Sequence, residues 1–303
     1  MLTSVWIGAD AVRAVTGKTK GGVLEIGAWR SEPLPPECVA GGVLVNEEPV
    51  RAALTALKEK MPDAAQGVRV VIDSGGVLVR KATAPKLPDK KLRQLVQSEF
   101  VSMAQGRGEL VYDYMTLGGA GAAQELLCAA AEKGLLESYI AVFAGAGLRV
   151  RGINAAAGAL ANLAGIDLLL DKTCIVCVAD GSMLDAALFV DGRFAFYNTT
   201  RLLAARGGYD SFAEIGRTLS SLIQFNASQH NGRQVSAVYF GGLTPEEAAP
   251  GALLSLVEGS YAVSAQAFGV SAQIKGAFGD AGAFPAAQYL FCVGDLYEGG
   301  RRA

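Results

Sequence analysis

The chain is poor in charge and has no strong bias toward either sign. Charged residues make up only 18% of its 303 residues, and the net charge is −2. A protein that binds nucleic acid needs a basic surface, yet no run of Lys or Arg here exceeds two residues. We therefore expect no nucleic-acid partner and no polybasic membrane patch. Because 51% of the residues are hydrophobic, the chain should instead bury sizeable cores.

Long apolar runs are also missing. The most apolar candidate, residues 160–178, is interrupted by Asp167, Asp171 and Lys172, whereas a membrane-spanning helix needs about 20 apolar residues. The first residues lack the basic and apolar regions of a signal peptide. We therefore expect a cytoplasmic protein without direct membrane insertion, which reaches the inner face of the cytoplasmic membrane only through a partner.

Histidine and cysteine are too scarce for most metal or redox chemistry. The single histidine, His230, cannot by itself form a zinc site or a Ser-His-Asp triad. We assign no catalytic residue and no protein metal site. The five cysteines are too dispersed for a disulfide framework: Cys38, Cys128, Cys174, Cys177 and Cys292. Two of them have CxxC spacing, but the apolar run 175–178 predicts a buried strand.

The strongest organisational signal is an internal duplication. Residues 5–29 and residues 175–197 share a pattern of short apolar strands separated by glycine-containing turns. In the second copy, Asp191-Gly192 is typical of a type I′ hairpin turn. The nearby Asp185, on a strand, is expected to face outward and not to act in catalysis. The duplication predicts a two-lobed α/β protein.

Helical patterns divide the chain further. Asn46 can cap a helix over 47–60, and apolar residues at helical spacing predict a second helix over 89–105 and a long one around 212–223. We predict a first lobe of residues 1–84 plus 153–172, an inserted α+β subdomain at 85–152, and a second lobe at 173–303. The C-terminal end of the second lobe either stays there or returns to the first.

Three glycine turns could bind phosphate and adenosine. They lie in residues 7–11, 179–182 and 240–243. Backbone N–H groups of tight turns can point at phosphate oxygens, and a Gly-Gly pair lets the backbone approach a ligand closely. Each turn alone is a weak signal, because glycine is common in hairpins. Their order within a duplicated pattern is typical of a nucleotide-binding fold.

At this point the chain resembles the actin-like ATPase superfamily and, within it, the PilM family of type IV pilus assembly proteins. The resemblance extends over nearly the whole chain. It rests on the segments 33–36, 42–46, 77–85, 98–100, 112–114, 207–208, 214–219 and 238–242. It implies a duplicated, ribonuclease H-like, actin-like fold of two lobes, with the insertion corresponding to the 1C subdomain of the cell-division protein FtsA.

The resemblance also implies where ATP and Mg²⁺ would bind. The implied nucleotide-binding residues are Gly8, Ala9, Asp10, Gly181, Ser182, Gly207, Gly208, Glu214, Arg217, Gly241 and Gly242. Glu214 and Arg217 are one helical turn apart, so they are equally well explained as a solvated ion pair.

Two positions depart from the family pattern. Trp6 and Ala179 stand where the family keeps the aspartates that organise Mg²⁺ and the attacking water. Mg²⁺ needs carboxylate oxygens or waters that carboxylates hold, and neither residue supplies them. Asp10 and Asp180 are displaced from these positions, and whether one of them compensates stays open. We therefore expect ATP and Mg²⁺ to bind weakly or not at all.

In the PilM family, a groove between the inserted subdomain and the first lobe receives the N-terminal cytoplasmic tail of the membrane protein PilN. The residues that we expect to line the corresponding groove are Leu78, Arg80, Pro85, Leu92, Leu95 and Phe100. Alternatively, Leu92, Leu95 and Phe100 form the core face of their helix.

The resemblance favours a cytoplasmic actin-like adaptor of a type IV pilus machine, with a PilN-like tail and other assembly components as partners. Two alternatives stay open. One is an active Mg-ATPase of the same family, and the other is the cytoplasmic part of a type II secretion protein.

Overall fold

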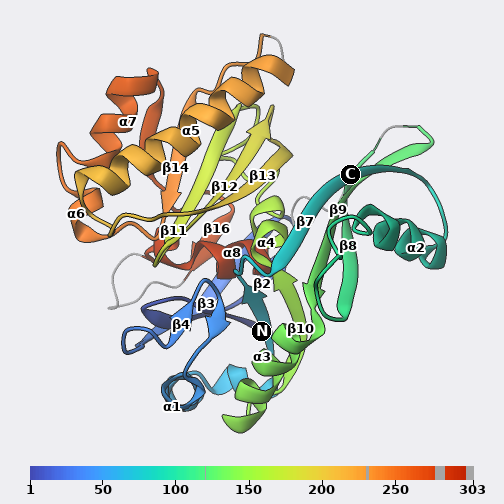
Figure 1. Cartoon of the computed structure of the whole chain (residues 1–303). Coiled ribbons are helices and arrows are strands. Elements are labelled where there is room, and N and C mark those ends of the chain that lie inside the picture. Colours follow the sequence, from blue (N-terminus) through green and yellow to red (C-terminus); the bar gives the residue numbers. More distant parts are fainter. Residues whose placement is uncertain (120, 230–231, 277–283, 298–303) are drawn as a thin grey trace.

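The computed structural model describes the chain apart from residues 120, 230–231, 277–283 and 298–303 (Figure 1). Its largest sheet has six strands in the order β10-β6-β1-β2-β3-β16. They are β1 (Leu2–Ile7), β2 (Ala11–Lys20), β3 (Val23–Pro33), β6 (Val68–Ile72), β10 (Val150–Ala155) and β16 (Ile274–Gly276). The antiparallel meander β1-β2-β3 carries a parallel strand on each side, which places the first glycine turn at one end of the sheet.

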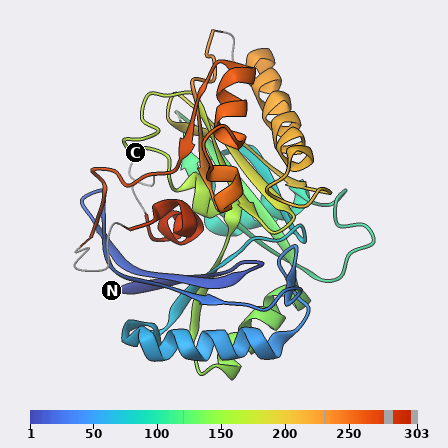
Figure 2. The same cartoon turned by 90° about the vertical axis from the view of Figure 1, so that its left-hand side faces the viewer.

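Helices cover both faces of the six-stranded sheet. On one face α1 (Glu47–Lys60) and α3 (Lys133–Gly145) share a hydrophobic core with the strands. On the other face lie α4 (Ala156–Ala161) and α8 (Leu290–Leu296). Figure 2 shows the sheet between α1 and α8. Because β16 and α8 come from the end of the chain, the C-terminal segment packs on the sheet that the N-terminus begins.

The second sheet has five strands in the order β13-β12-β11-β14-β15. They are β11 (Cys174–Asp180), β12 (Met183–Val190), β13 (Arg193–Arg201), β14 (Ala237–Gly241) and β15 (Ser264–Ala267). Two helices, α5 (Tyr209–Gln229) and α7 (Leu253–Tyr261), share a core with one face. Residues of the other face join α4, α8 and η2 (Ala286–Tyr289) in a core between the two large sheets. The duplicated pattern therefore forms two sheets packed through shared helices.

A small three-stranded sheet, in the order β7-β9-β8, lies to one side (Figure 1). It consists of β7 (Val77–Pro85), β8 (Leu110–Gly118) and β9 (Ala123–Glu132), with α2 (Asp89–Glu99) on one face. This sheet already starts at Val77, before the predicted boundary at residue 85, because β7 pairs with β9 along its whole length. The remaining short elements are β4 (Val39–Ala40), β5 (Val43–Leu44), η1 (Pro62–Gln66) and α6 (Pro245–Ala248).

Several local predictions are confirmed by the structure. Asn46 caps α1 by accepting the Glu48 N–H at 3.3 Å. Asp191 and Gly192 have φ angles of 50° and 72°, as a type I′ turn requires. All five cysteines are buried and free, and the CxxC pair lies in β11.

The predicted helix over 89–105 is too long. The α2 helix ends at Glu99, because Phe100 takes φ −106° and ψ 2° while burying its ring completely. Among the described residues, no helix is long and apolar enough to cross a membrane.

Candidate functional site

The first two glycine turns touch each other. We call them the seam, consisting of residues 8–10 between β1 and β2 and residues 180–182 between β11 and β12. The Asp180 carboxylate accepts the Ala9 N–H at 2.7 Å. A Cβ on Gly181 would lie 2.7 Å from the Ala9 Cβ, so the two turns are in van der Waals contact. The backbone N–H of Ala9, which a phosphate oxygen would need, is already occupied.

Charged side chains beside the seam pair with each other. The Asp10 carboxylate pairs with the Arg13 guanidinium at 2.8 Å, and that guanidinium stacks on the Trp6 ring at 5.1 Å. Burial raises the pKa of Asp10, but the hydrogen bond and positive charge of Arg13 outweigh it, so the pKa is lowered. Burial raises the pKa of Asp180 to about 6, although the Ala9 N–H and Arg13 act in the opposite direction. The two displaced aspartates are thus both engaged by groups of the chain itself.

The third turn, residues 241–242, is also packed by the chain. A Cβ on Gly242, whose φ is 68°, would lie 2.2 Å from the Ala179 carbonyl oxygen, so only glycine fits there. The Arg206 guanidinium donates to the Gly242 carbonyl at 2.9 Å and pairs with the fully buried Glu247. Gly207, with φ 86°, packs against Glu246. Arg206 therefore ties the third turn to α6.

Glu214 contacts the segment after β13, whose Leu202 N–H donates to the Ser182 carbonyl of the second turn. One Glu214 oxygen accepts the N–H groups of Leu203 and Ala204 at 2.8 and 3.3 Å, and the other lies 3.8 Å from Arg217. Arg217 is 71% exposed. The solvated-pair interpretation fits this geometry, and Glu214 also holds the loop that precedes α5. Ser182 is exposed at the tip of its turn, and Gly208 lies immediately before α5.

The residues at the seam do not fit a magnesium-bound phosphate. Trp6 is buried with its ring 5.0 Å from that of Phe291, and Ala179 is buried in β11. Neither side chain has an oxygen to offer. In the described ranges, no group of three or more His, Cys, Asp or Glu could hold a metal ion. His230 lies outside the described residues.

A buried pair of carboxyl groups was not expected from the sequence. Asp73 follows β6, and Asp185 lies in β12, where it accepts hydrogen bonds from Tyr197 and from Thr199 (2.8 Å). Burial, followed by the neighbouring charge of Asp185, raises the pKa of Asp73 well above its usual range. The prediction that Asp185 faces outward is wrong, because α4 packs against β12 and the Asp185 side chain is fully buried. The sequence signal for this buried carboxyl group was an acidic residue within the otherwise apolar strand β12.

A groove with a volume of about 1050 Å³ lies between the three-stranded sheet and the six-stranded sheet. Its walls are one face of the three-stranded sheet, the outer side of α3 and the edge strand β10. Apolar side chains of these walls include Val77, Val79, Val111, Met115, Leu127, Ala129, Leu136 and Ile140. Val111 and Ile140 are 43% and 46% exposed, so the groove presents apolar surface to solvent.

None of the six residues predicted to line this groove does so. Leu78, Leu92 and Phe100 are buried in the core between α2 and the small sheet, with Leu95 packed against that core. Arg80 pairs with Glu99 of α2 at 3.2 Å, and Pro85 is exposed at the end of β7. The cause is strand alternation: even-numbered residues of β7 face α2, and Val77 and Val79 face the groove. The alternative interpretation of the α2 residues as a core face is therefore confirmed.

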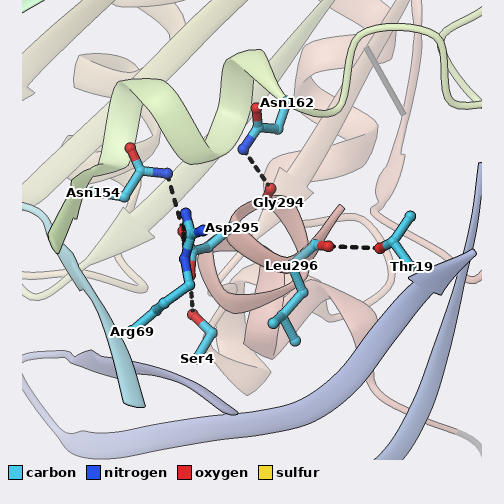
Figure 3. A network of polar contacts seen from close by, with 8 residues as sticks. All are labelled: Ser4, Thr19, Arg69, Asn154, Asn162, Gly294, Asp295 and Leu296. Atoms are coloured by element: carbon cyan, nitrogen blue, oxygen red, sulfur yellow. Dashed lines mark hydrogen bonds and ion pairs between the residues drawn. The ribbon is translucent and has the colours of Figure 1, made fainter. Parts of the chain in front are cut away.

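A buried ion pair forms part of the groove's floor (Figure 3). Arg69 of β6 pairs with Asp295 of α8 at 2.6 Å, and both Arg69 and Asn154 line the groove. Asp295 is fully buried and also accepts hydrogen bonds from Ser4 (2.8 Å) and Asn154 (3.1 Å). A carboxylate from the C-terminal helix thus fixes two groove-lining side chains from the six-stranded sheet.

Charges are arranged unevenly around the groove. Near the start of α2, Arg93 is held by Asp89 at 2.9 Å and by Asp113 at 3.3 Å. At the end near α3, Arg149 is exposed and has no ion-pair partner among the described residues. A ligand with an acidic residue at that end would be favoured.

Comparison with known proteins gives both a family and a fold. The model of the family described as "Type IV pilus assembly protein PilM" matches residues 4–174. A solved "PilM-PilN type IV pilus biogenesis complex" matches with TM-score 0.77 and 17% identity, covering 99% of this chain and 98% of that chain. No curated protein matches the sequence significantly.

Two further structures share the fold more distantly. The ethanolamine utilization protein EutJ from Carboxydothermus hydrogenoformans has TM-score 0.52 at 11% identity, covering 98% of this chain and 89% of its own. A Bacteroides thetaiotaomicron protein described as having an actin-like ATPase fold has TM-score 0.51 at 10% identity, with 88% and 90% covered. The predicted actin-like fold is confirmed.

Proposed function

The chain belongs to the family of type IV pilus assembly protein PilM, and from this premise we propose that it is an adaptor that binds the N-terminal tail of a PilN-like membrane protein. The tail would occupy the groove between the three-stranded and six-stranded sheets. In this proposal the adaptor works in the cytoplasm, is recruited to the inner membrane by the tail, and contacts other components of a pilus assembly machine.

The open apolar groove is the observation that carries this proposal. Two of its walls are edge strands, β10 of the six-stranded sheet and β8 of the three-stranded sheet. Edge strands offer free backbone N–H and C=O groups to an extended peptide, and pockets between them select its side chains. The solved structure with TM-score 0.77 is a complex of PilM with PilN, which supports a partner of the same kind here.

We further propose that the nucleotide site is vestigial. Its support is the seam, where the Ala9 N–H, Asp10 and Asp180 are engaged within the chain and the two turns are in contact. Binding of a nucleotide would require these turns to separate and the Asp180 hydrogen bond to break. No observation at the seam favours the alternative of a working ATPase.

Calorimetric titration of the full chain with a synthetic PilN-like tail, and separately with ATP and Mg²⁺, tests both proposals. Micromolar binding of the tail and no heat from Mg-ATP are expected. Ala129→Arg places a long cation on the groove wall formed by β9 and should lower tail affinity by about tenfold or more. Ala123→Arg is the matched control, because Ala123 is exposed on the same strand but outside the groove.

Two outcomes contradict the proposals separately. A tail that fails to bind, or that binds Ala129→Arg as well as the wild type, removes the adaptor proposal. Magnesium-dependent ATP binding with turnover removes the vestigial site and restores the ATPase alternative.

A further inference from the structure

The strand β13 is a free edge with one bulge at Ala195, followed by regular pairing over residues 196–201. It spans nine residues and ends the five-stranded sheet, and among the described residues no strand pairs with its outer side. Natural proteins usually shield such an edge with short length, Pro or inward charges. The opposite edge follows this rule, because β15 has only four residues. β13 contains no Pro, and residues 194–200 carry no charge, so its free backbone groups can pair with another extended chain.

A second groove runs beside this edge. It has a volume of about 550 Å³ and lies between β13 and α5. Phe196, Leu222 and Phe225 line its apolar part, and the rings of the two phenylalanines lie 4.6 Å apart. Asn198 and Thr200, two and four residues after Phe196, also line it. Since alternate residues of a strand share a face, an added strand would place every second side chain over this groove.

The groove is positively charged at the end of β13. Arg201 is exposed and has no ion-pair partner in the part of the chain that the structure describes. Arg217, 71% exposed, lies 3.8 Å from Glu214. Glu214, which also accepts two backbone N–H groups, offsets one of these two positive charges and leaves a net positive charge at this end. Next to these groups, Leu203 is 86% exposed, which adds apolar surface at the same end.

From these observations we propose that the β13 edge is a second docking site, which binds an extended segment of a partner protein by adding it as a sixth strand. The segment would carry apolar residues at alternate positions over Phe196 and Phe225 and one or two acidic residues beside Arg201 and Arg217. This site is distinct from the first groove, which β10 lines, because the two grooves share no lining residue. The chain would thus hold two partner segments at once.

The test uses two fluorescent synthetic peptides and the full chain. The sequence Glu-Asp-Leu-Thr-Val-Ser-Val and its reverse place the acids near Arg201 in the antiparallel and the parallel orientation. At least one should bind in fluorescence anisotropy with a dissociation constant of about 100 µM or lower. Its counterpart with Lys in place of both acids should bind at least about tenfold more weakly. Amide hydrogen exchange within β13 should slow when the acidic peptide binds.

Four single-residue variants test where the acidic peptide binds. Arg201→Glu should weaken the acidic peptide by about tenfold or more, and Ser221→Trp, at an exposed position of α5, should block the groove. Arg193→Glu, at the other end of β13, is the matched control and should leave affinity unchanged. Ile140→Glu alters the first groove, so it should weaken PilN-like tail binding by about tenfold without affecting this peptide.

Three results would overturn the proposal. They are no binding of either acidic peptide, equal binding of the Lys peptide, or full binding to both Arg201→Glu and Ser221→Trp. If the peptide binds while the PilN-like tail does not, only the first docking proposal fails.

Discussion

The seam and the first groove both lie where separate parts of the chain meet, but one is closed and the other is open. At the seam, two turns touch, and the Ala9 N–H is satisfied by Asp180 at 2.7 Å. The groove keeps a volume of about 1050 Å³ and leaves Val111 and Ile140 nearly half exposed. The Ala9 N–H, Asp180 and Asp10 at the seam are therefore paired within the chain, while the groove exposes apolar surface and two strand edges that no described strand pairs with.

The seam has its own core contacts, such as that between Trp6 and Phe291. These contacts stabilise the closed arrangement without a ligand. A groove lined by exposed apolar residues gains stability only when something covers it.

The largest loss of stability is expected when an aspartate replaces Trp6 beside the seam. Trp6→Asp removes a buried ring that packs on Phe291 and under Arg13, and it buries a carboxyl group. We expect the free energy of unfolding to fall by about 4 kcal/mol or more, measured by urea denaturation. Trp6→Phe, the control, should cost about 1–2 kcal/mol. A folded Trp6→Asp protein that binds Mg-ATP would contradict the view that the seam is closed and the groove open.

The second prediction concerns the ion pair between Arg69 and Asp295 at the first groove. Asp295→Ala leaves the Arg69 guanidinium without its carboxylate and removes acceptors from Ser4 and Asn154. Unfolding free energy should fall by about 3 kcal/mol. The double variant Arg69→Met with Asp295→Leu removes both charges and should recover much of that loss. Equal stabilities of the single and double variants would show that the pair contributes nothing to the groove floor.

The third prediction is a pH dependence at the seam. The pKa of Asp180 is about 6 in the native state, above the unfolded value of about 3.9. The native state therefore holds the proton more tightly, and stability is lost as pH rises from about 4 to about 6. Asp180→Asn keeps an acceptor for the Ala9 N–H and carries no charge.

This variant should be more stable than the wild type by roughly 3 kcal/mol at about pH 7, and by less than about 1 kcal/mol at about pH 4. Thermal denaturation across this range measures the difference. A difference that is independent of pH would mean that Asp180 is not desolvated, and hence that the seam is open in solution.

The smallest effect is expected at the groove wall. Ile140→Glu replaces a half-exposed apolar side chain of α3 by a charged one. Tail affinity should fall by about tenfold, which corresponds to about 1.4 kcal/mol, with little change in stability. Val101→Glu is the matched control, since Val101 is 64% exposed and lies outside the groove. Equal losses in both variants would point to general electrostatics instead of groove binding.

Local chemistry made much of the fold predictable. The Asn46 cap, the Asp191-Gly192 turn and the buried CxxC strand depend on neighbouring residues, so the sequence alone indicates them. The end of α2 was missed because the position of Phe100 is decided by the core it enters. The predicted position of Arg80 in the groove was wrong because alternation of side chains along β7 shows that the strand has two different faces. It does not show which face contacts α2.

By itself, the sequence determined the duplicated two-lobed pattern and the apolar residues Trp6 and Ala179 beside the first two glycine turns, because these depend on residue order and identity. Only the tertiary structure decided that Asp180 meets Ala9, that Asp185 is buried beside Asp73, and that the groove is lined by Val79 and not by Leu78. The physical reason is that each of these contacts joins residues far apart in the chain, so that packing of whole sheets brings them together.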